Sequence, residues 1–466
     1  MPKNVKPNGQ SKVAQDNANR SHPWQLLILA VPLILANITT PLLGLVDTAI
    51  LGHMNEAAYL AGASIGTLIL TQLYWICGFI KMSVTGLSAQ SAGGQDKADE
   101  ARLKVLIQGI TLGLVLGLIF VVLQSPILSA GLYFAQSSDE FALSTQAYFS
   151  VRVWGAPAAL INLALVGWLI GQQKTRTILL LQVVVNLINI VFSVLFVFGF
   201  GWGIEGVAAA TVLAEYSLLA CSLYAALRIV NLNLYQAAWL KFSALKALLN
   251  LNTNILFRNL ALQFTLAFVT FTGATLGTQT AATNAILMQF FALIALGLDG
   301  VANAVEALVG EQKGRRNLSM LKRQVNTGLF WSSIFSLVYA IVFWLFGSDI
   351  INLLTDQLSL RENAKSYLGL MIALPLIAHW CFLFDGVFVG LTHGRAMRDS
   401  MILSAAVGFF AVWWMVSTLI QGSDAYAGME NYGLWLALLS FLASRGLILG
   451  LWYGYLLRKP DERLWI

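Results

Sequence analysis

The sequence predicts an all-α membrane protein in which twelve transmembrane helices form two pseudo-symmetric lobes of six helices each. Of its 466 residues, 58% are hydrophobic and only 11% are charged, whereas a soluble globular chain has about 25% charged residues. Twelve stretches are long and apolar enough to cross a bilayer as helices. The two halves of the chain also share residues at a constant spacing, which indicates an internal repeat.

The predicted spans begin after a polar N-terminal stretch. Residues 1–23 lack the apolar core of a signal peptide, and we expect them to form a disordered cytoplasmic tail. The spans are expected at residues 24–50, 58–80, 104–124, 147–171, 177–199, 204–227, 255–277, 281–308, 325–346, 366–391, 400–420 and 433–457. The domains that follow from them are an N-lobe (24–228), a cytoplasmic linker (229–254), a C-lobe (255–457) and a cytoplasmic C-terminal tail (458–466).

The distribution of Lys and Arg predicts the orientation. The two tails and the even-numbered loops hold 24 of the 28 basic residues, whereas the odd-numbered loops hold only Arg361 and Lys365. Basic loops are retained in the cytoplasm, so we expect both termini to be cytoplasmic in a multi-pass protein of the bacterial inner membrane. The net charge of +6 is explained by this orientation, and no nucleic-acid partner is expected.

The repeat is clearest between residues 148–176 and 367–395. At a constant offset of 219, four pairs coincide: Tyr148/Tyr367, Gly167/Gly386, Gly171/Gly390 and Arg176/Arg395. A second stretch, 89–94 after the second span, resembles 310–315 after the eighth. Because each half has six spans, the repeats run parallel about an axis along the membrane normal, and a transport route is expected between or within the lobes.

The first span contains a carboxylate, Asp47, at or near membrane depth. A charge there costs about 2.5–3.5 kcal/mol, which favours a polar cavity or a protonated form over contact with lipid. Asn37, Thr40, Gly44 and Asp47 recur at steps of three, four and three, so they share one helix face. Pro41 lacks an N–H and makes a natural bend point. An acid beside a hinge suggests a protonation switch; the alternative is hydrogen bonding between helices.

Other intramembrane polar residues form two groups. The fifth span carries four of them at steps of four, three and four, and the sixth carries two at a step of four; with Asp47 they predict a polar pocket for substrate or cation in the N-lobe. These residues are Gln182, Asn186, Asn189, Ser193, Thr211 and Glu215. Glu215 and Glu205, which lie nearer to the ends of segments, are interpreted as structural.

The C-lobe contains a second acidic group. Asp299, Asn303 and Glu306 are spaced by four and three in the eighth span, and Asp385 lies in the tenth. This group is either a cation or substrate site or an inter-helix network. The network would pair the acids with Arg258 or Arg445.

Motifs for other chemistry are missing from the sequence. It has no G-x-x-x-x-G-K-[ST], so the energy for transport must come from an ion gradient. Neither metal-ligand spacing nor a disulfide framework is present. We therefore expect that the protein is not an enzyme and that it binds no cofactor and no metal. The residues considered for these roles are His53, His379, His393, Cys77, Cys221 and Cys381.

Six short motifs resemble the multidrug and toxic compound extrusion (MATE) transporters, specifically their bacterial DinF-like branch. In chain order they are P-L-L-G-L-V-D-T-A-I-L-G-H, M-S-V-T-G-L-S-A-Q, G-W-L-I-G, I-E-G-V-A-A-A-T-V-L-A-E-Y, L-D-G-V-A-N-A-V-E-A and F-D-G-V-F-V-G. The resemblance covers nearly the whole chain after the tail. It implies a V-shaped pair of lobes that exports amphipathic, often cationic compounds in exchange for H⁺ or Na⁺.

The resemblance also implies roles for individual residues. Asp47 matches the acid of the first span, whose protonation is associated with bending of that helix, and Asn189 and Thr211 match its polar partners. Ser193 stands where many relatives carry a second acid, which leaves Asp47 as the main titrating group of the pocket. Glu306 and Asp385 match acids that bind cations in other branches. The seventh span, however, offers Asn259 and Gln263 in place of an acid, so a Na⁺ site there would be short of charge.

The favoured interpretation is a monomeric multidrug efflux transporter that is coupled to H⁺ through Asp47 and bends at Pro41. Its partners would be H⁺ or Na⁺, small amphipathic or cationic compounds and membrane lipid. One alternative is a Na⁺-coupled antiporter that uses the acids of the C-lobe. Another is a flippase for lipid-linked precursors, which needs a large cationic cavity, although only Arg152, Arg258 and Arg445 lie near membrane depth. The third alternative is a membrane enzyme or receptor that does not transport a substrate.

Overall fold

A computed structural model describes residues 24–54, 57–94, 97–135, 139–421, 429–458 and 460–465. Within these ranges the chain forms helices and no strands. Twelve helical segments are long and apolar enough to cross a membrane, which confirms the predicted number. The predicted N-terminal tail, residues 1–23, lies outside the described residues.

The helices divide into two bundles that follow the order of the chain. The N-lobe contains α2 (Trp24–Gly52), α3 (Ala57–Ile76), α4 (Phe79–Gly93), α5 (Ala98–Val122), α6 (Gln124–Ala135), α7 (Asp139–Arg152), α8 (Ala156–Gly171), α9 (Thr175–Val194) and α10 (Gly203–Leu227). The C-lobe contains α11 (Phe242–Thr275), α12 (Thr278–Gly314), α13 (Leu318–Leu354), α14 (Leu358–Ser366), α15 (Leu368–Gly390), α16 (Gly394–Leu403), α17 (Val412–Gln421), α18 (Glu430–Arg458) and the short α19 (Pro460–Arg463). A π-helical turn ends α9, and a second one joins α16 to α17.

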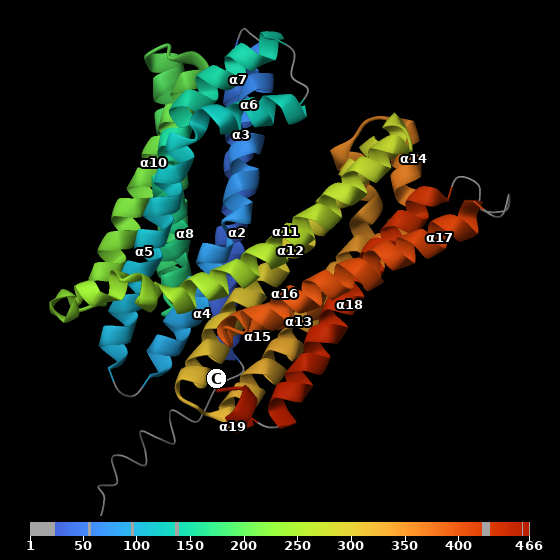
Figure 1. The fold of residues 1–466 in the computed structure, drawn as a ribbon. Helices are drawn as coiled ribbons and strands as arrows, with labels where there is room; N and C mark the ends of the chain where they lie inside the picture. Colours follow the sequence, from blue (N-terminus) through green and yellow to red (C-terminus); the bar gives the residue numbers. More distant parts are fainter. Residues whose placement is uncertain are drawn as a thin grey trace, which may run out of the picture.

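The two lobes form a V (Figure 1). They lie close together at the end of the molecule where the C-terminus is found, and they diverge toward α6 and α7 in one lobe and α14 in the other. Near the closed end, α12 packs against α2 and α4 of the N-lobe. Leu26 and Ala30 of α2 share a buried apolar cluster with Val301 and Val305 of α12, so the first helix of the chain is held by both lobes.

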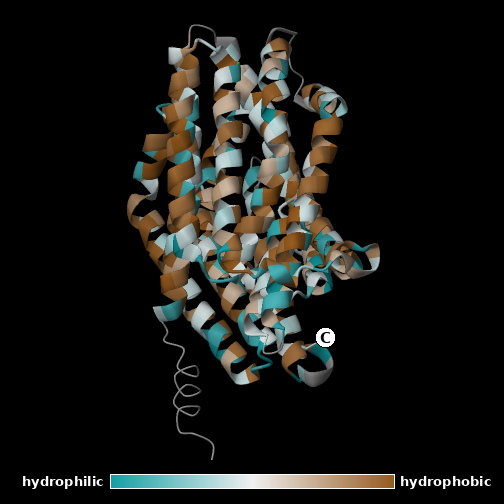
Figure 2. Ribbon diagram, turned by 90° about the vertical axis from the view of Figure 1, so that its left-hand side faces the viewer, coloured by the Kyte–Doolittle hydropathy of each residue, from teal (hydrophilic) through white to brown (hydrophobic). Residues whose placement is uncertain are grey.

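The outer surface matches a lipid environment. Along the long helices the ribbon is mostly hydrophobic, and hydrophilic segments gather toward the end near the C-terminus (Figure 2). Many large apolar side chains are exposed, among them Trp75, Leu187, Phe271 and Trp344. Contiguous apolar exposure on this scale is foreign to soluble proteins, and it agrees with a multi-pass membrane protein.

The second span is longer than predicted because α4 continues it to Gly93. We expected it to end at residue 80, since the following residues are polar. In the structure these polar groups bond to protein: the Ser83 hydroxyl donates to Asn252 Oδ1 at 2.6 Å, and the Ser88 hydroxyl donates to the Trp168 carbonyl at 2.8 Å. Lys81, one residue beyond the predicted end of this span, therefore lies inside a helix between the lobes.

The seventh span also begins earlier than predicted. Helix α11 starts at Phe242, so residues 242–254 are helical although we had assigned them to the linker. Part of the reason is again polar contact with protein, because the Asn252 side chain is buried against α4. The non-helical connection between α10 and α11 is correspondingly short, and 3₁₀ turns fill part of it.

Backbone geometry supports the internal repeat. Among the described residues, four that are not glycine have positive φ: Lys97, Gln173, Arg316 and Thr392. They form two pairs, Lys97/Arg316 and Gln173/Thr392, each separated by the offset of 219 that the sequence predicts. Non-glycine residues adopt this conformation rarely, so its recurrence at matching positions indicates that the two halves share their local turns.

The lobes meet along a seam that obeys the same pseudo-symmetry. A Cβ on Gly93 would collide with the Glu311 carbonyl, and a Cβ on Gly314 would collide with the Gln90 carbonyl. Gln90 and Glu311 are 221 residues apart, as are Gly93 and Gly314. This is the offset between stretches 89–94 and 310–315, two more than the 219 of the other pairs, so the two contacts are equivalent within that stretch of the repeat. Glycine is required at both positions because helix backbones touch there.

Hydrogen bonds across the seam are equivalent in the same way. Gln90 Nε2 donates to Thr392 Oγ1 at 3.0 Å, and Gln173 Nε2 donates to Glu311 Oε2 at 2.7 Å. Gln90 corresponds to Glu311, and Gln173 corresponds to Thr392. We refer to these two bonds and the two glycine contacts together as the inter-lobe seam.

Candidate functional site

Asp47 lies in the second half of α2, where its side chain is half-buried. Its Oδ1 atom is buried, and no hydrogen-bond partner for this atom is present among the described residues. No Lys, Arg or His side chain in the described ranges approaches the carboxylate within the 4.0 Å that defines an ion pair. A buried carboxylate oxygen without a partner is costly when ionised, so this group is suited to bind a proton or a cation.

The nearby cation is already paired with another acid. Arg152, the last residue of α7, exerts an electrostatic attraction on Asp47. Its guanidinium, however, donates to both carboxylate oxygens of Glu215 on α10, at 2.8 and 2.6 Å. Gly155 makes room for this pair, because a Cβ there would collide with Glu215 Oε2. The charge of Arg152 is thus compensated locally, and Asp47 is left without a partner of its own.

The polar residues predicted on α9 and α10 come together in part. Asn189 Nδ2 donates to Thr211 Oγ1 at 3.1 Å, and the Ser193 hydroxyl donates to Asn189 Oδ1 at 3.3 Å. Asn189 and Ser193 are fully buried. The network therefore links α9 to α10 inside the N-lobe with neutral groups, which leaves acid chemistry in this lobe to other residues.

The earlier residues of α9 face the hinge region of α2. Asn186 Nδ2 donates at 3.3 Å to the carbonyl of Thr39, two residues before Pro41, and Gln182 Nε2 donates to Asn186 Oδ1 at 3.4 Å. Pro41 itself is exposed, and α2 continues through it as one helix. Asn186 thus supplies α2 with a polar contact two residues before the proline, which weakens the helix ladder. The side chain of Thr40 lies outside the described residues.

Asn37 points away from this group. Its Nδ2 atom donates at 3.1 Å to the Leu296 carbonyl on α12 of the C-lobe. The predicted polar face of α2 is therefore divided between two surroundings. Asn37 lies at the interface with the C-lobe, whereas Asp47 lies ten residues further along the helix, inside the N-lobe.

In the C-lobe, Asp385 is bound by two arginines. Its Oδ2 atom accepts a hydrogen bond from Arg258 of α11 at 2.5 Å and another from Arg445 of α18 at 2.6 Å. All three side chains are largely buried. Arg258 also donates to Asn259 Oδ1 at 3.0 Å, which occupies a neutral oxygen that a cation could have used. The pairing alternative that the sequence offered thus holds for Asp385, with both arginines rather than one.

The other C-lobe candidates lie on α12. Asp299 is exposed, Asn303 is half-buried, and Glu306 is buried with no hydrogen-bond partner in the described ranges for its Oε1 atom. Lys81 of α4 attracts both carboxylates electrostatically. The three acids influence one another electrostatically but differ in their pairing. Asp385 is bound by two arginines, whereas neither Asp299 nor Glu306 has an ion-pair partner in the described ranges. No group of three or more His, Cys, Asp or Glu within the described ranges could hold a metal ion.

Three features of these sites are not predicted from the sequence. Lys81 was missed because the polar residues around it resemble a loop. The Arg152–Glu215 pair joins two charges that the sequence places in the fourth and sixth spans of one lobe, and their opposite signs were an available signal. Tyr148, whose hydroxyl accepts from Thr67 at 3.0 Å, was noted only as part of the repeat.

The fold and the site together define a class. Two pseudo-symmetric bundles of membrane-spanning helices, with polar and ionisable side chains buried inside each bundle, make up the architecture of a secondary transporter. The family model for MatE matches residues 32–195 and 255–414. The chain belongs to the MatE family, whose members are transporters and not enzymes.

Individual relatives agree with this assignment. The chain is 38% identical over 424 residues to DNA damage-inducible protein F of Escherichia coli (strain K12), with 90% of each chain covered. It is 24% identical over 463 residues to the probable multidrug resistance protein NorM of Rhizobium meliloti (strain 1021), covering 95% of this chain and 96% of that one. These matches confirm the resemblance to the MATE transporters and to their DinF-like branch.

Solved structures show the same fold. A MATE crystal structure in the bent conformation superposes with a TM-score of 0.82 at 17% identity, covering 95% of this chain and 97% of that one. A MATE crystal structure in the straight conformation gives a TM-score of 0.79, also at 17% identity, with 95% and 98% covered. The predicted V-shaped pair of six-helix lobes is confirmed.

Proposed function

We propose that this transporter exports amphipathic, often cationic compounds across the bacterial inner membrane in exchange for H⁺, with Asp47 as the coupling residue. The observation that carries the proposal is the buried Oδ1 atom of Asp47, which has no hydrogen-bond partner in the described ranges. A protonated carboxyl group needs no counter-charge at this position, whereas an ionised one attracts a cation.

Antiport follows from competition for one group. The proton and a cationic cargo stabilise opposite charge states of Asp47, so each one displaces the other. If the two states also prefer different conformations of α2, binding on one side of the membrane favours release on the other. Pro41, six residues before Asp47, supplies a position where α2 can bend at low cost.

The arrangement of charges favours H⁺ over Na⁺ and drug export over lipid flipping. Na⁺ needs several free oxygen ligands in one site. In the C-lobe, Asp385 is held by two arginines, and although Glu306 Oε1 has no partner in the described ranges, the positive charge of Lys81 acts on Glu306 and opposes a second cation there. A pyrophosphate head group needs free cations. Among the described residues, three arginines near membrane depth are each paired with a carboxylate: Arg152, Arg258 and Arg445.

Transport in proteoliposomes tests the proposal. We expect a fluorescent organic cation to be pumped under an imposed H⁺ gradient and not under a Na⁺ gradient alone. Transport driven only by Na⁺ would contradict proton coupling. Lipid scrambling without any movement of the cation would favour the flippase.

The proposed orientation predicts which loops are reachable from outside. Tyr133 on α6 is 79% exposed at the end where the lobes diverge (Figure 1). In a Cys221→Ser background, Tyr133→Cys should react with an impermeant thiol reagent in intact cells. Lys174→Cys, an exposed position in the turn between α8 and α9, should react only after permeabilisation. The reverse pattern would invert the topology.

The hinge predicts an effect of Pro41→Ala. Restoring an N–H at this position strengthens the helix ladder and penalises the bent state, so we expect normal folding with a several-fold lower rate of export. Pro32→Ala is the matched control, because Pro32 lies in the same helix but fifteen residues before Asp47. Initial rates in proteoliposomes and the unfolding temperature in detergent measure the two effects. Unchanged turnover of the Pro41 variant would remove the hinge from the mechanism.

A further inference from the structure

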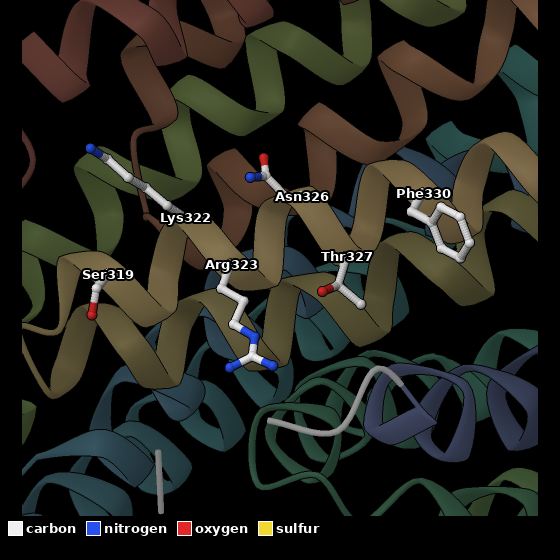
Figure 3. A pocket seen from close by; sticks show the side chains of 6 residues that line it. All are labelled: Ser319, Lys322, Arg323, Asn326, Thr327 and Phe330. Atoms are coloured by element: carbon white, nitrogen blue, oxygen red, sulfur yellow. The ribbon is translucent and has the colours of Figure 1, made fainter. Parts of the chain in front are cut away.

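The first turns of α13 carry a shallow, open depression of about 500 Å³, which we call the groove (Figure 3). Its lining consists of six side chains of this one helix: Ser319, Lys322, Arg323, Asn326, Thr327 and Phe330. In Figure 3, Lys322 and Asn326 stand on one side of the helix face and Arg323 and Thr327 on the other. The spacing of three and four places all six on one face.

The groove is cationic and uncompensated. Lys322 and Arg323 are exposed, and neither has an ion-pair partner among the residues that the structure describes. By contrast, Arg315 just before the helix is paired with Glu311 at 2.6 Å. No acidic side chain lines the groove. Two free cations beside hydroxyl and amide groups are the donor set that binds phosphate oxygens.

The position of the groove along α13 matches the head-group level of a membrane. The helix has 37 residues, which gives a length of about 55 Å, whereas the hydrocarbon core is about 30 Å thick. Lys322 and Arg323 lie within the first two turns, so they can remain outside the hydrocarbon core. Further along, the exposed residues become apolar, from Phe330, which is 58% exposed, to Leu337 and Ile341.

We propose that this face of α13 binds an anionic phospholipid of the cytoplasmic leaflet. The phosphate lies between Lys322 and Arg323, and one acyl chain lies along Phe330, Leu337 and Ile341. These three residues are separated by seven and four positions, so they continue the face that carries the cations. A lipid with a net negative charge is favoured over a zwitterionic one, because a choline group would be repelled by two uncompensated cations.

Aromatic contacts connect this face of α13 to α2, the helix that carries the proposed coupling residue Asp47. The ring of Phe330 packs edge-on against that of Trp331 at 5.4 Å, and the ring of Trp331 lies 5.6 Å from that of Trp24 at the start of α2. A lipid against Phe330 therefore lies two ring contacts from α2. We expect occupancy of the groove to influence the rate of transport as well as lipid retention.

Native mass spectrometry of the purified full-length protein tests the site. With phosphatidylglycerol and phosphatidylcholine of identical acyl chains, the wild type should retain phosphatidylglycerol at least several-fold better. The Lys322→Ala/Arg323→Ala variant should lose that preference. The Lys241→Ala/Lys246→Ala variant, which removes the same charge from exposed positions at the start of α11, should keep it. An unchanged preference in the groove variant, or no preference in the wild type, would overturn the proposal.

Three further measurements separate a lipid site from a simple charge effect. Phe330→Ala should weaken retention of both lipids while the preference between them remains, because this residue contacts the acyl chain. Inorganic phosphate at millimolar concentration should not displace phosphatidylglycerol; displacement would show that the groove binds free phosphate instead. In proteoliposomes, adding phosphatidylglycerol should raise the transport rate of the wild type and of the α11 control, but not of the groove variant. Equal stimulation of all three would contradict the site.

Discussion

Asp47→Asn is expected to reduce export driven by a proton gradient to the level of liposomes without protein, while the variant inserts and folds normally. The asparagine is nearly isosteric, but it can neither take up nor release a proton. Because Asp47 has no ion-pair partner in the described ranges, the loss of its charge leaves no other group uncompensated. The measurement is uptake of a fluorescent cation into proteoliposomes under an imposed ΔpH, with the unfolding temperature as the check on folding.

The controls for this variant are the acids of the C-lobe. Asp299→Asn and Glu306→Gln should retain proton-driven transport, since the proposal gives them no part in coupling. If the Asp47 variant still pumps the cation and variants of Asp299, Glu306 or Asp385 are inactive, the coupling site lies in the C-lobe and our assignment is wrong.

Asp385→Asn is expected to destabilise the protein by about 3–5 kcal/mol, the usual cost of removing one partner from a buried ion pair. Arg258 and Arg445 both donate to this carboxylate, so the substitution leaves two buried guanidinium groups without a counter-charge. These residues belong to α11, α15 and α18, and the loss should loosen the packing of all three helices. The unfolding midpoint in detergent and the yield of folded protein measure it.

A double variant separates the charge effect from a general loss of packing. Asp385→Asn/Arg445→Gln removes one of the two uncompensated cations and should recover part of the lost stability. Asp299→Asn, at an exposed position on α12, should change stability little. Wild-type stability in the Asp385 variant would show that the ion pairs do not hold these helices together.

The sequence predicts spans where helices face lipid, because lipid requires apolar side chains. The prediction of the second span fails at α4 because α4 does not face lipid and so does not need apolar side chains. This helix lies between other helices, and its Ser83 and Ser88 hydroxyl groups bond to protein, so its composition resembles that of a loop. The repeat could be detected because shared turns constrain sequence at matching positions, as with Gln173 and Thr392.

For the candidate site, residue spacing predicts which side chains share one face of a helix better than it predicts which neighbouring helix covers that face. The steps on α9 correctly placed Asn189 and Ser193 in one buried network with Thr211. The same argument grouped Asn37 with Asp47, although Asn37 bonds to the C-lobe, because a helix wedged between two lobes presents one face to two neighbours. Helical periodicity cannot show which neighbour covers which turn.

The inter-lobe seam has the geometry of an isologous dimer interface, in which residue i touches j while the equivalent of j touches the equivalent of i. Gln90 meets Gly314 as Glu311 meets Gly93, as if two copies of a six-helix subunit had associated about a two-fold axis before one chain joined them. Reciprocal contacts of this kind are lost together when the halves rotate apart. Opening at this end should therefore be a cooperative, two-position event, and a graded widening of the seam is not expected.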